Sequence, residues 1–255
     1  MILTDTHTHL YSEAFEEDRN EMIKRAIEAN VTRFFIPAID STYTNAMLQL
    51  EADFPDHIFL MTGLHPTHVK QNYKEELQHV EDLLSERTFC AIGEIGIDLY
   101  WDKSTLQMQI DAFKHQINLA KKYQLPIVIH CRDAFDEVFQ VLEEEKSKDL
   151  HGILHCFAGN FEQAKQAISY NMKLGIGGVV TFKNGGIDQF LSEIDLKHIV
   201  METDSPYLAP KPYRGKRNES SYIIQVLDKL SEIYGLSKEE IAAITTQNSK
   251  DVFNI

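Results

Sequence analysis

The sequence predicts an α/β fold, a TIM-like (β/α)8 barrel followed by C-terminal helices. The chain has 255 residues, which matches the roughly 250 residues typical of such barrels. Short apolar runs rich in β-branched residues alternate with amphipathic segments along the whole chain, and this pattern indicates parallel strands joined by helical crossovers. There are eight such runs, which is the number of strands that closes this kind of barrel.

The eight predicted strands are the apolar runs themselves. They lie at residues 2–10, 31–38, 58–66, 89–98, 125–131, 152–157, 172–178 and 198–206. Two of the clearest helical segments between them lie at residues 19–30 and 104–123. In the second, Leu106, Ile110 and Phe113 begin a series of apolar residues at three- and four-residue steps, the spacing of one helix face.

Two more helices are expected after the last strand, at residues 218–234 and 238–253. Ser237 stands at the position of a helix N-cap, and Glu240 occupies the matching capping-box position. The pattern is not interrupted by a linker, an internal repeat or a low-complexity tract. We therefore expect residues 1–255 to form a single domain.

The composition is that of a folded, enzyme-sized protein. The chain is 43% hydrophobic and 25% charged, which is ordinary for a globular protein and wrong for a disordered one. Its net charge of −14 argues against broad adhesion to duplex nucleic acid or anionic membranes, although a local basic site is compatible with it. The three cysteines lack C-x-x-C spacing, and the sequence has neither a leader pattern nor a membrane-length apolar run. We expect a cytoplasmic protein with reduced thiols, no membrane association and no obligate protein partner.

The stretch TDTHTHL at residues 4–10 raises the question of function. In a continuous strand, Asp5, His7 and His9 would share one face. Taken alone, such a pair of histidines is explained equally well by a polar strand edge. The ends of the other strands decide the matter, because the active site of such a barrel lies at the carboxyl ends of its strands. The unusual polar residues expected at those ends are His7, His9, Glu94, His130, His155, Glu202 and Asp204.

Four histidines and two or three carboxylates in one barrel mouth require cations among them, because buried unpaired carboxylates are costly. Imidazole and carboxylate ligands suit zinc, manganese or iron, whereas carboxylate-rich sites favour magnesium. Six ligands suit two divalent ions that share one carboxylate. Such a pair lowers the pKa of water and clamps the oxygens of a phosphoryl or acyl centre. The sequence therefore predicts a metal-dependent hydrolase.

Six motifs resemble those of the TatD family of metal-dependent deoxyribonucleases, in the amidohydrolase superfamily. They are TDTHTHL, TGLHP, AIGEIGIDLY, IVIHCRDA, LHCFAGN and METDSPYLAPKPYRGKRN, in order along the chain. The resemblance implies a 3′-to-5′ exodeoxyribonuclease with two divalent ions, Mg²⁺, Mn²⁺ or Zn²⁺. It also implies the ligand set, in which His7, His9 and Asp204 hold one metal, His130 and His155 hold the other, and Glu94 bridges them.

Asp204 and Glu202 are two residues apart on the last predicted strand, so both are expected to face the barrel interior, while Met201 and Thr203 face the helices. We interpret Asp204 as a ligand that also accepts a proton from the attacking water, and Glu202 as a carboxylate that orients a ligand imidazole. For Glu202 the alternative is a buried carboxylate held by backbone donors.

Five further residues are predicted to contact the substrate. His65, at the end of the third strand, is assigned to a substrate phosphate or leaving oxygen, with a structural hydrogen bond as the alternative. Arg132 lies two residues beyond His130 and is interpreted as a phosphate contact; the alternative is an ion pair with Asp133 or Glu137. The other three are basic residues of the loop at 208–218, for which a solvated charge run is the alternative. They are Arg214, Lys216 and Arg217.

The predicted substrate is a single-stranded or frayed DNA end. A barrel mouth is narrow and concave, so a polynucleotide would enter by its end or as a flexible strand. Four aromatic residues near the mouth could stack on bases; these are Tyr100, Trp101, Tyr207 and Tyr213. The alternatives are a small-molecule amidohydrolase or esterase, a hydrolase of aminoacyl-tRNA esters, and a noncatalytic metal-dependent binding protein, against which the complete ligand set argues.

Overall fold

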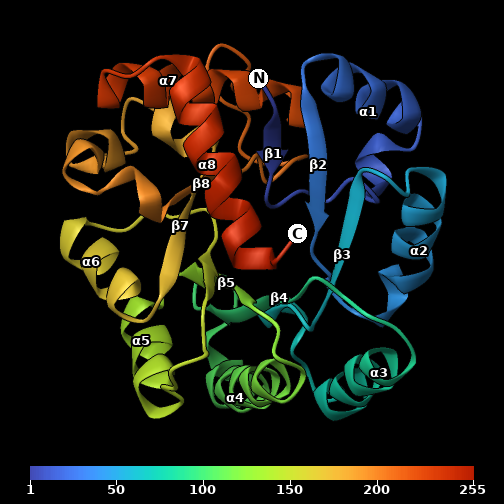
Figure 1. Cartoon of the computed structure of the whole chain (residues 1–255). Coiled ribbons are helices and arrows are strands. Elements are labelled where there is room, and N and C mark those ends of the chain that lie inside the picture. The colour runs from blue at the N-terminus through green and yellow to red at the C-terminus, as the bar shows by residue number, and fades with distance from the viewer.

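The computed structural model describes residues 1–255 and contains eight strands in one sheet. The strands follow one another around the sheet in chain order, and neighbouring strands are parallel. Figure 1 shows the strands at the centre with helices around them. The predicted TIM-like barrel is confirmed. The strands are β1 Leu3–Asp5, β2 Val31–Ile36, β3 Ile58–Thr62, β4 Ala91–Asp98, β5 Ile127–Arg132, β6 Gly152–Leu154, β7 Met172–Ile176 and β8 Ile199–Met201.

Hydrogen bonds made at and just beyond the ends of β8 and β1 join the last strand to the first. The amide of Thr6 donates to the carbonyl oxygen of Met201 at 3.1 Å, and the amide of Asp204 donates to the carbonyl oxygen of His7 at 2.9 Å. The two chain segments that leave these strands are therefore fixed against each other at the barrel mouth.

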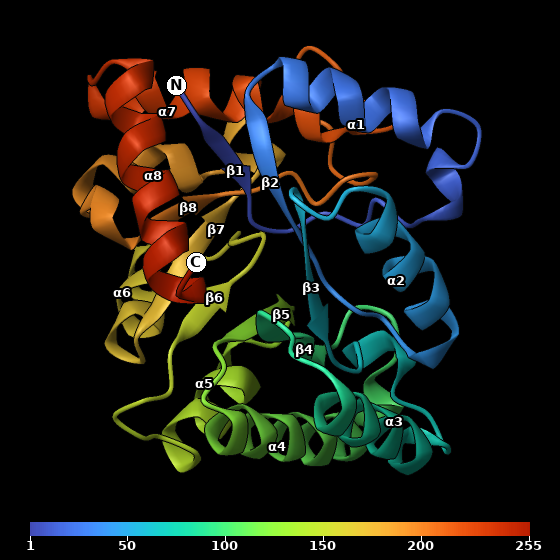
Figure 2. The same ribbon diagram turned by 45° about the vertical axis from the view of Figure 1, so that its right-hand side comes forward.

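The α-helices surround the sheet, except that α8 crosses the end at which the strands begin (Figures 1 and 2). The chain between β7 and β8 has no α-helix and instead makes four short 3-10 turns within residues 178–198. No helix combines the length and the apolar character needed to span a membrane. The helices are α1 Arg19–Glu28, α2 Thr44–Asp53, α3 Tyr73–Glu86, α4 Leu106–Tyr123, α5 Phe135–Glu144, α6 Phe161–Ser169, α7 Ile223–Tyr234 and α8 Lys238–Phe253.

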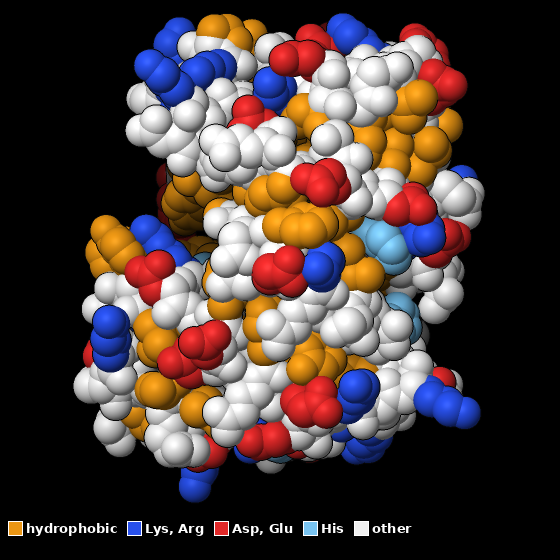
Figure 3. All heavy atoms as spheres, turned by 90° about the vertical axis from the view of Figure 1, so that its left-hand side faces the viewer, with side chains coloured by type: hydrophobic (Ala, Val, Ile, Leu, Met, Phe, Trp, Pro, Cys, Tyr) orange, Lys and Arg blue, Asp and Glu red, His pale blue; other side chains and the backbone are white.

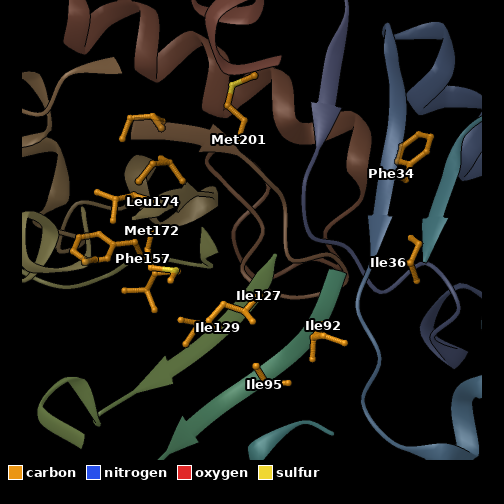
Figure 4. Packing of buried hydrophobic residues seen from close by; sticks show 14 of the residues in the cluster. Phe34, Ile36, Ile92, Ile95, Ile127, Ile129, Phe157, Met172, Leu174 and Met201 are labelled. Atoms are coloured by element: carbon orange, nitrogen blue, oxygen red, sulfur yellow. The ribbon is translucent and has the colours of Figure 1, made fainter. Parts of the chain in front are cut away.

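The hydrophobic core has an outer and an inner layer, because successive side chains of a strand point to opposite faces. Ile92 and Ile95 of β4 and Ile127 and Ile129 of β5 belong to the large outer cluster between strands and helices (Figure 4). The inner cluster fills the barrel and includes two residues of α8. Its buried members are Phe35, Met61, Ala91, Val128, Ile153, Val200, Val252 and Phe253.

Helix α8 closes the barrel at the strand starts. The hydroxyl of Thr246 donates to the carbonyl oxygen of Ile2 at 3.1 Å. The side-chain amide of Asn248 donates to the carbonyl oxygen of Ile199 at 2.7 Å. The ring of Phe253 stacks on Phe35 with 3.9 Å between centroids. The predicted capping box of Ser237 and Glu240 begins this helix.

Truncating the side chain of Phe253 should therefore destabilise the whole barrel. We expect Phe253→Ala to lower the free energy of unfolding by about 3 to 5 kcal/mol, the usual cost of removing a buried phenyl ring. Ile255→Ala, two residues further on but 41% exposed, should change it by less than about 0.5 kcal/mol. Urea unfolding curves measure both values. Equal effects of the two substitutions would contradict the closing role of Phe253.

The first strand is shorter than predicted, and this changes the placement of its polar residues. β1 ends at Asp5, so His7 and His9 lie in the segment that follows it. The expectation that Asp5 shares a face with these histidines is wrong. The carboxylate of Asp5 instead accepts hydrogen bonds from the hydroxyls of Thr203 at 2.6 Å and Ser220 at 2.7 Å. The chain leaves the sheet here because its amides find partners across the mouth; that of His9 donates to the carbonyl oxygen of Ser205 at 2.8 Å.

A β-bulge in β4 sets the orientation of Glu94. In the pairing with β5, Gly93 lies opposite Val128 and Ile95 lies opposite Ile129, so Glu94 is an extra residue without a partner position. Such an insertion re-aims the side chains that follow it. Ile95 therefore joins the outer cluster, and the carboxylate of Glu94 points into the mouth.

Candidate metal centre

Glu94 is the centre of the polar cluster, because each of its carboxylate oxygens faces a different pair of histidines. Its Oε2 lies 3.0 Å from Nε2 of His7 and 3.6 Å from Nε2 of His9. Its Oε1 lies 2.8 Å from Nδ1 of His130 and 2.8 Å from Nε2 of His155. One buried carboxylate thus connects residues from four parts of the chain.

Asp204 completes the half of the cluster that contains His7 and His9. Its Oδ1 lies 3.5 Å from Nε2 of His9 and 3.8 Å from Nε2 of His7. The backbone of Asp204 is left-handed, with φ of 55°, and so is that of Cys156, with φ of 45°. Non-glycine residues adopt this conformation at a cost and mostly where a site requires it. The turns after β8 and β6 are therefore shaped by the residues that they present to the mouth.

The charge state of the cluster follows from its burial. Burial opposes ionisation of Glu94, but the facing histidines His155, His65 and His7 hold its pKa well below the usual range. Burial and the neighbouring His155 lower the pKa of His7, and the two rings stack with 3.8 Å between centroids. Two stacked imidazoles cannot both carry a proton without strong repulsion. Burial opposes protonation of His155 as well, but Glu94 and Glu202 raise its pKa well above the usual range. The metal-free cluster therefore pairs ionised carboxylates with a protonated His155 and with a neutral His7, whose lone pair is free for a metal ion.

This donor set fits divalent metal ions. Three groups of side chains have ligand atoms within 4.8 Å of one another; they are His7, His155 and Asp204; His7, His9 and Glu94; and His65, Glu94 and His130. Imidazole nitrogens and carboxylate oxygens are the ligands that Zn²⁺ and Mn²⁺ accept. The six residues predicted as ligands all lie in this cluster, and His155 lies between its two halves.

His65 was assigned to the substrate, but the structure places it against the same carboxylate. Its Nε2 lies 3.1 Å from Oε1 of Glu94, and its Nδ1 lies 2.7 Å from the hydroxyl of Thr67. It is a third histidine on Oε1, and it also lines the pocket above the cluster.

Asp98, His68 and Asp40 belong to the site but are not among the residues predicted from the sequence. Oδ2 of Asp98 lies 2.8 Å from Nε2 of His130, and so fixes the ring whose other nitrogen faces Glu94. The spacing GEIGID, which puts Asp98 four residues after Glu94 on one strand, was a signal for it. Nδ1 of His68 lies 2.5 Å from Oδ2 of Asp40 at the pocket wall. Sequence spacing gives no signal for that pair, because Asp40 follows β2 and His68 follows β3.

Glu202 lies behind His155, as its predicted orienting role requires. Its Oε1 accepts a hydrogen bond from the amide of Cys156 at 2.6 Å and lies 3.5 Å from Nδ1 of His155. A side chain at Gly175 would not fit, because its Cβ would lie 2.2 Å from Oε2 of Glu202. The structure thus shows the carboxylate held by a backbone donor, whereas Nδ1 of His155 is close to it without a hydrogen bond.

Neutralising Glu202 should weaken metal binding while leaving the fold intact. A carboxylate behind a ligand imidazole fixes its tautomer and raises its basicity, and loss of such a partner typically lowers metal affinity by about 10- to 100-fold. We expect this loss in Glu202→Gln, measured by competition with a chelating dye. Glu162→Gln, whose parent side chain is 75% exposed, should bind metal as the unmodified protein does. Equal affinities of the two variants would contradict the orienting role.

A pocket of about 690 Å³ opens above the cluster. Figure 3 shows a recess at the left edge of the molecule, with hydrophobic side chains along it and a cationic side chain at its lower border. Arg132 is the one lysine or arginine among the residues that line the pocket. The pocket is lined by His9, Ile39, His65, Thr67, His68, Glu94, Asp98, Trp101, His130, Cys131, Arg132, His155, Cys156, Ala158, Val179, Asp204, Tyr207 and Leu208.

The basic loop after β8 contributes no cation to this lining. Arg217 forms a two-pronged ion pair with Asp18, at 2.6 and 2.7 Å. The guanidinium of Arg214 lies over the ring of Phe182, 3.7 Å from its centroid. Lys216 is exposed and outside the pocket lining. The structure thus brings Arg132 to the pocket and leaves these three residues away from it.

Comparison with known proteins places the chain among metal-dependent hydrolases. A family model described as TatD related DNase matches residues 4–254. The uncharacterized metal-dependent hydrolase YabD of Bacillus subtilis is 41% identical over 100% of both chains. The 3′-5′ ssDNA/RNA exonuclease TatD of Erwinia tasmaniensis is 28% identical, covering 98% of this chain and 99% of that one. The crystal structure of YJJV, a TatD homologue from Escherichia coli K12, matches with a TM-score of 0.93 at 26% identity, over 99% of this chain and 98% of that one.

Proposed function

Because the chain belongs to the TatD related DNase family of metal-dependent hydrolases, we propose that it is a 3′-to-5′ exonuclease of single-stranded DNA ends that works with two divalent ions. The observation that carries the proposal is the position of Glu94, whose two oxygens face His7 and His9 on one side and His130 and His155 on the other. A single carboxylate shared in this way suits two adjacent ions.

The proposed ligands divide between the two halves of the cluster. His7, His9 and Asp204 would hold one ion, His130 and His155 the other, and Glu94 both. Bound divalent ions lower the pKa of water and counter the charge on phosphate oxygens. The imidazole-rich donor set favours Mn²⁺ or Zn²⁺ over Mg²⁺.

The chain's own residues supply the remaining chemistry. The carboxylate of Asp204 lies at the pocket floor and would take the proton of the attacking water. Asp98 holds the ring of His130 from behind, and Glu202, 3.5 Å from Nδ1 of His155, would orient that ring when a metal is bound. Arg132 at the pocket wall would bind a phosphate oxygen and orient the scissile bond. His65 would contact a substrate phosphate or leaving oxygen.

The pocket supports the choice of a strand end as substrate. Its volume of about 690 Å³ suits one or two nucleotides rather than an intact duplex. A relative that is 28% identical carries the name 3′-5′ ssDNA/RNA exonuclease. The closed floor, with the metal ligands at its base, favours removal of nucleotides from an end over cleavage within a strand.

The test follows a single-stranded oligonucleotide labelled at either end. The 5′-labelled strand should shorten step by step, and the 3′-labelled strand should release its label at once. Chelation should stop the reaction, and addition of Mn²⁺, Zn²⁺ or Mg²⁺ in turn should show which ion restores it. Turnover of cyclic amides or simple esters, with the oligonucleotide left intact, would overturn the proposal in favour of a small-molecule hydrolase.

A further inference from the structure

Two aromatic side chains stand exposed at the rim of the pocket, in the loop that follows β4. Tyr100 is 54% and Trp101 70% exposed, an unfavourable position for large apolar groups unless they meet a partner. Their loop is not free, because Oδ1 of Asp98 accepts hydrogen bonds from the amides of Tyr100 at 3.0 Å and Trp101 at 3.2 Å. The other oxygen of the same carboxylate holds His130. The aromatic pair is thus fixed in position relative to the candidate metal centre.

Arg132 joins these aromatic residues from the neighbouring strand. It lies opposite Asp98 in the pairing of β4 with β5. The centre of its guanidinium lies 3.7 Å from the centroid of the Tyr100 ring and 5.6 Å from that of Trp101. The guanidinium therefore stacks on the ring of Tyr100, and it is not engaged with Asp133 or Glu137. The rings of Tyr100 and Trp101 meet edge to face, with 4.9 Å between centroids, so the guanidinium and the Trp101 ring offer a stacking surface together with hydrogen-bond donors.

A second pair of exposed, largely apolar side chains lines the same pocket from the turn that follows the last strand. Tyr207 is 53% and Leu208 37% exposed, and both lie in the turn after β8. The side-chain amide of Asn218 donates to the carbonyl oxygen of Tyr207 at 2.7 Å and steadies this turn. In a ring of eight strands β4 and β8 are four positions apart, so the two apolar pairs lie on opposite sides of the pocket.

We propose that Tyr100, Trp101 and Arg132 form a stacking site for a nucleobase of a single strand whose terminal phosphodiester lies at the metal centre. This proposal rests on the proposed function and adds that a base of the substrate binds at the pocket rim. A base has a π face whatever its sequence, so aromatic and guanidinium surfaces bind single strands with little preference. The pocket's single arginine lies two residues after His130 on β5 and over the ring of Tyr100, where a base and its phosphate would both reach it.

The one tryptophan of the chain makes the site directly observable. The sequence contains a single Trp, so fluorescence excited at the long-wavelength edge of the absorption band, where tyrosine does not absorb, reports Trp101 alone. We would titrate the metal-loaded protein with a thymidine hexamer whose phosphorothioate linkages resist hydrolysis, and with an abasic chain of the same length and linkages. The hexamer should quench the fluorescence saturably, and the abasic chain should quench it little. Equal quenching by both chains, or none by the hexamer, would overturn the stacking site.

Substitutions provide the second measurement. Trp101→Leu and Tyr100→Leu should raise KM for a single-stranded oligonucleotide by roughly 5- to 150-fold, the range for loss of one base stack, with little change in KM for an abasic substrate. Tyr170→Leu is the matched control, because that ring stacks on Phe139 with 5.9 Å between centroids and lies outside the pocket lining. An unchanged KM in Trp101→Leu would overturn the proposal.

The two proposals fail in different ways. If the wild-type protein leaves oligonucleotides intact, the exonuclease assignment is wrong. The fluorescence titration with the resistant hexamer still decides whether bases stack at this site. If the wild-type protein degrades the oligonucleotide but shows no base-dependent quenching, the exonuclease assignment stands and the stacking site is wrong.

Discussion

Glu94→Gln is expected to abolish hydrolysis and to lower the content of both metal ions. The carboxylate faces two histidine nitrogens with Oε2 and three with Oε1. An amide of the same shape keeps one acceptor oxygen, turns N–H donors toward the other half of the cluster and removes the charge shared by the two ions. Both halves should therefore lose affinity together, although the side-chain volume is nearly unchanged.

Metal stoichiometry by elemental analysis tests this expectation. His155→Ala provides the comparison, because it should empty mainly the half that it shares with His130. Urea unfolding of both variants would show that the barrel is retained. Two tightly bound ions and near-normal turnover in Glu94→Gln would show that Glu94 does not bridge the two halves.

Asp204→Asn is expected to reduce turnover by several orders of magnitude with the fold intact. The substitution removes a ligand and also the group that can take the proton of the attacking water. The rate of release from an oligonucleotide end, at saturating metal, is the measurement. Asp195→Asn, whose parent carboxylate is 59% exposed and pairs with Lys197, should retain normal turnover. A rate in Asp204→Asn above a tenth of the wild-type rate, a barrier change of only about 1.4 kcal/mol, would contradict the assigned role.

The fold could be predicted because each strand coincides with an apolar run. Each connection between strands has either an amphipathic helical pattern or a polar sequence. Strand lengths were harder to predict. The run at residues 2–10 contains polar residues that satisfy a strand pattern equally well, but the strand ends at Asp5 because the later amides bond across the mouth. That competition between partners depends on the closed barrel and is not visible in local sequence.

The site was predictable wherever a residue lies in or shortly after the carboxyl end of a strand, as His130 in β5 and Asp204, three residues after β8, do. The orientation of Glu94 depends on a bulge, and strict alternation from Gly93 would have turned its carboxylate toward the helices. The basic loop shows the converse difficulty. Arg217 lies in the loop after β8 and is therefore expected at the mouth, but it pairs with Asp18, which is distant in sequence. Residues that are distant in sequence thus determine both the orientation of Glu94 and the position of Arg217.

The link between the end of β8 and the segment after β1 also constrains how the protein matures. His7 and His9 are synthesised long before Asp204, whose amide bonds to the carbonyl oxygen of His7. Contacts between such distant residues form late, because a long loop must close first. The nascent chain therefore carries two histidines without the carboxylate that completes their half of the cluster. This half of the cluster should therefore bind metal only after Asp204 has been synthesised and has closed onto His7 and His9.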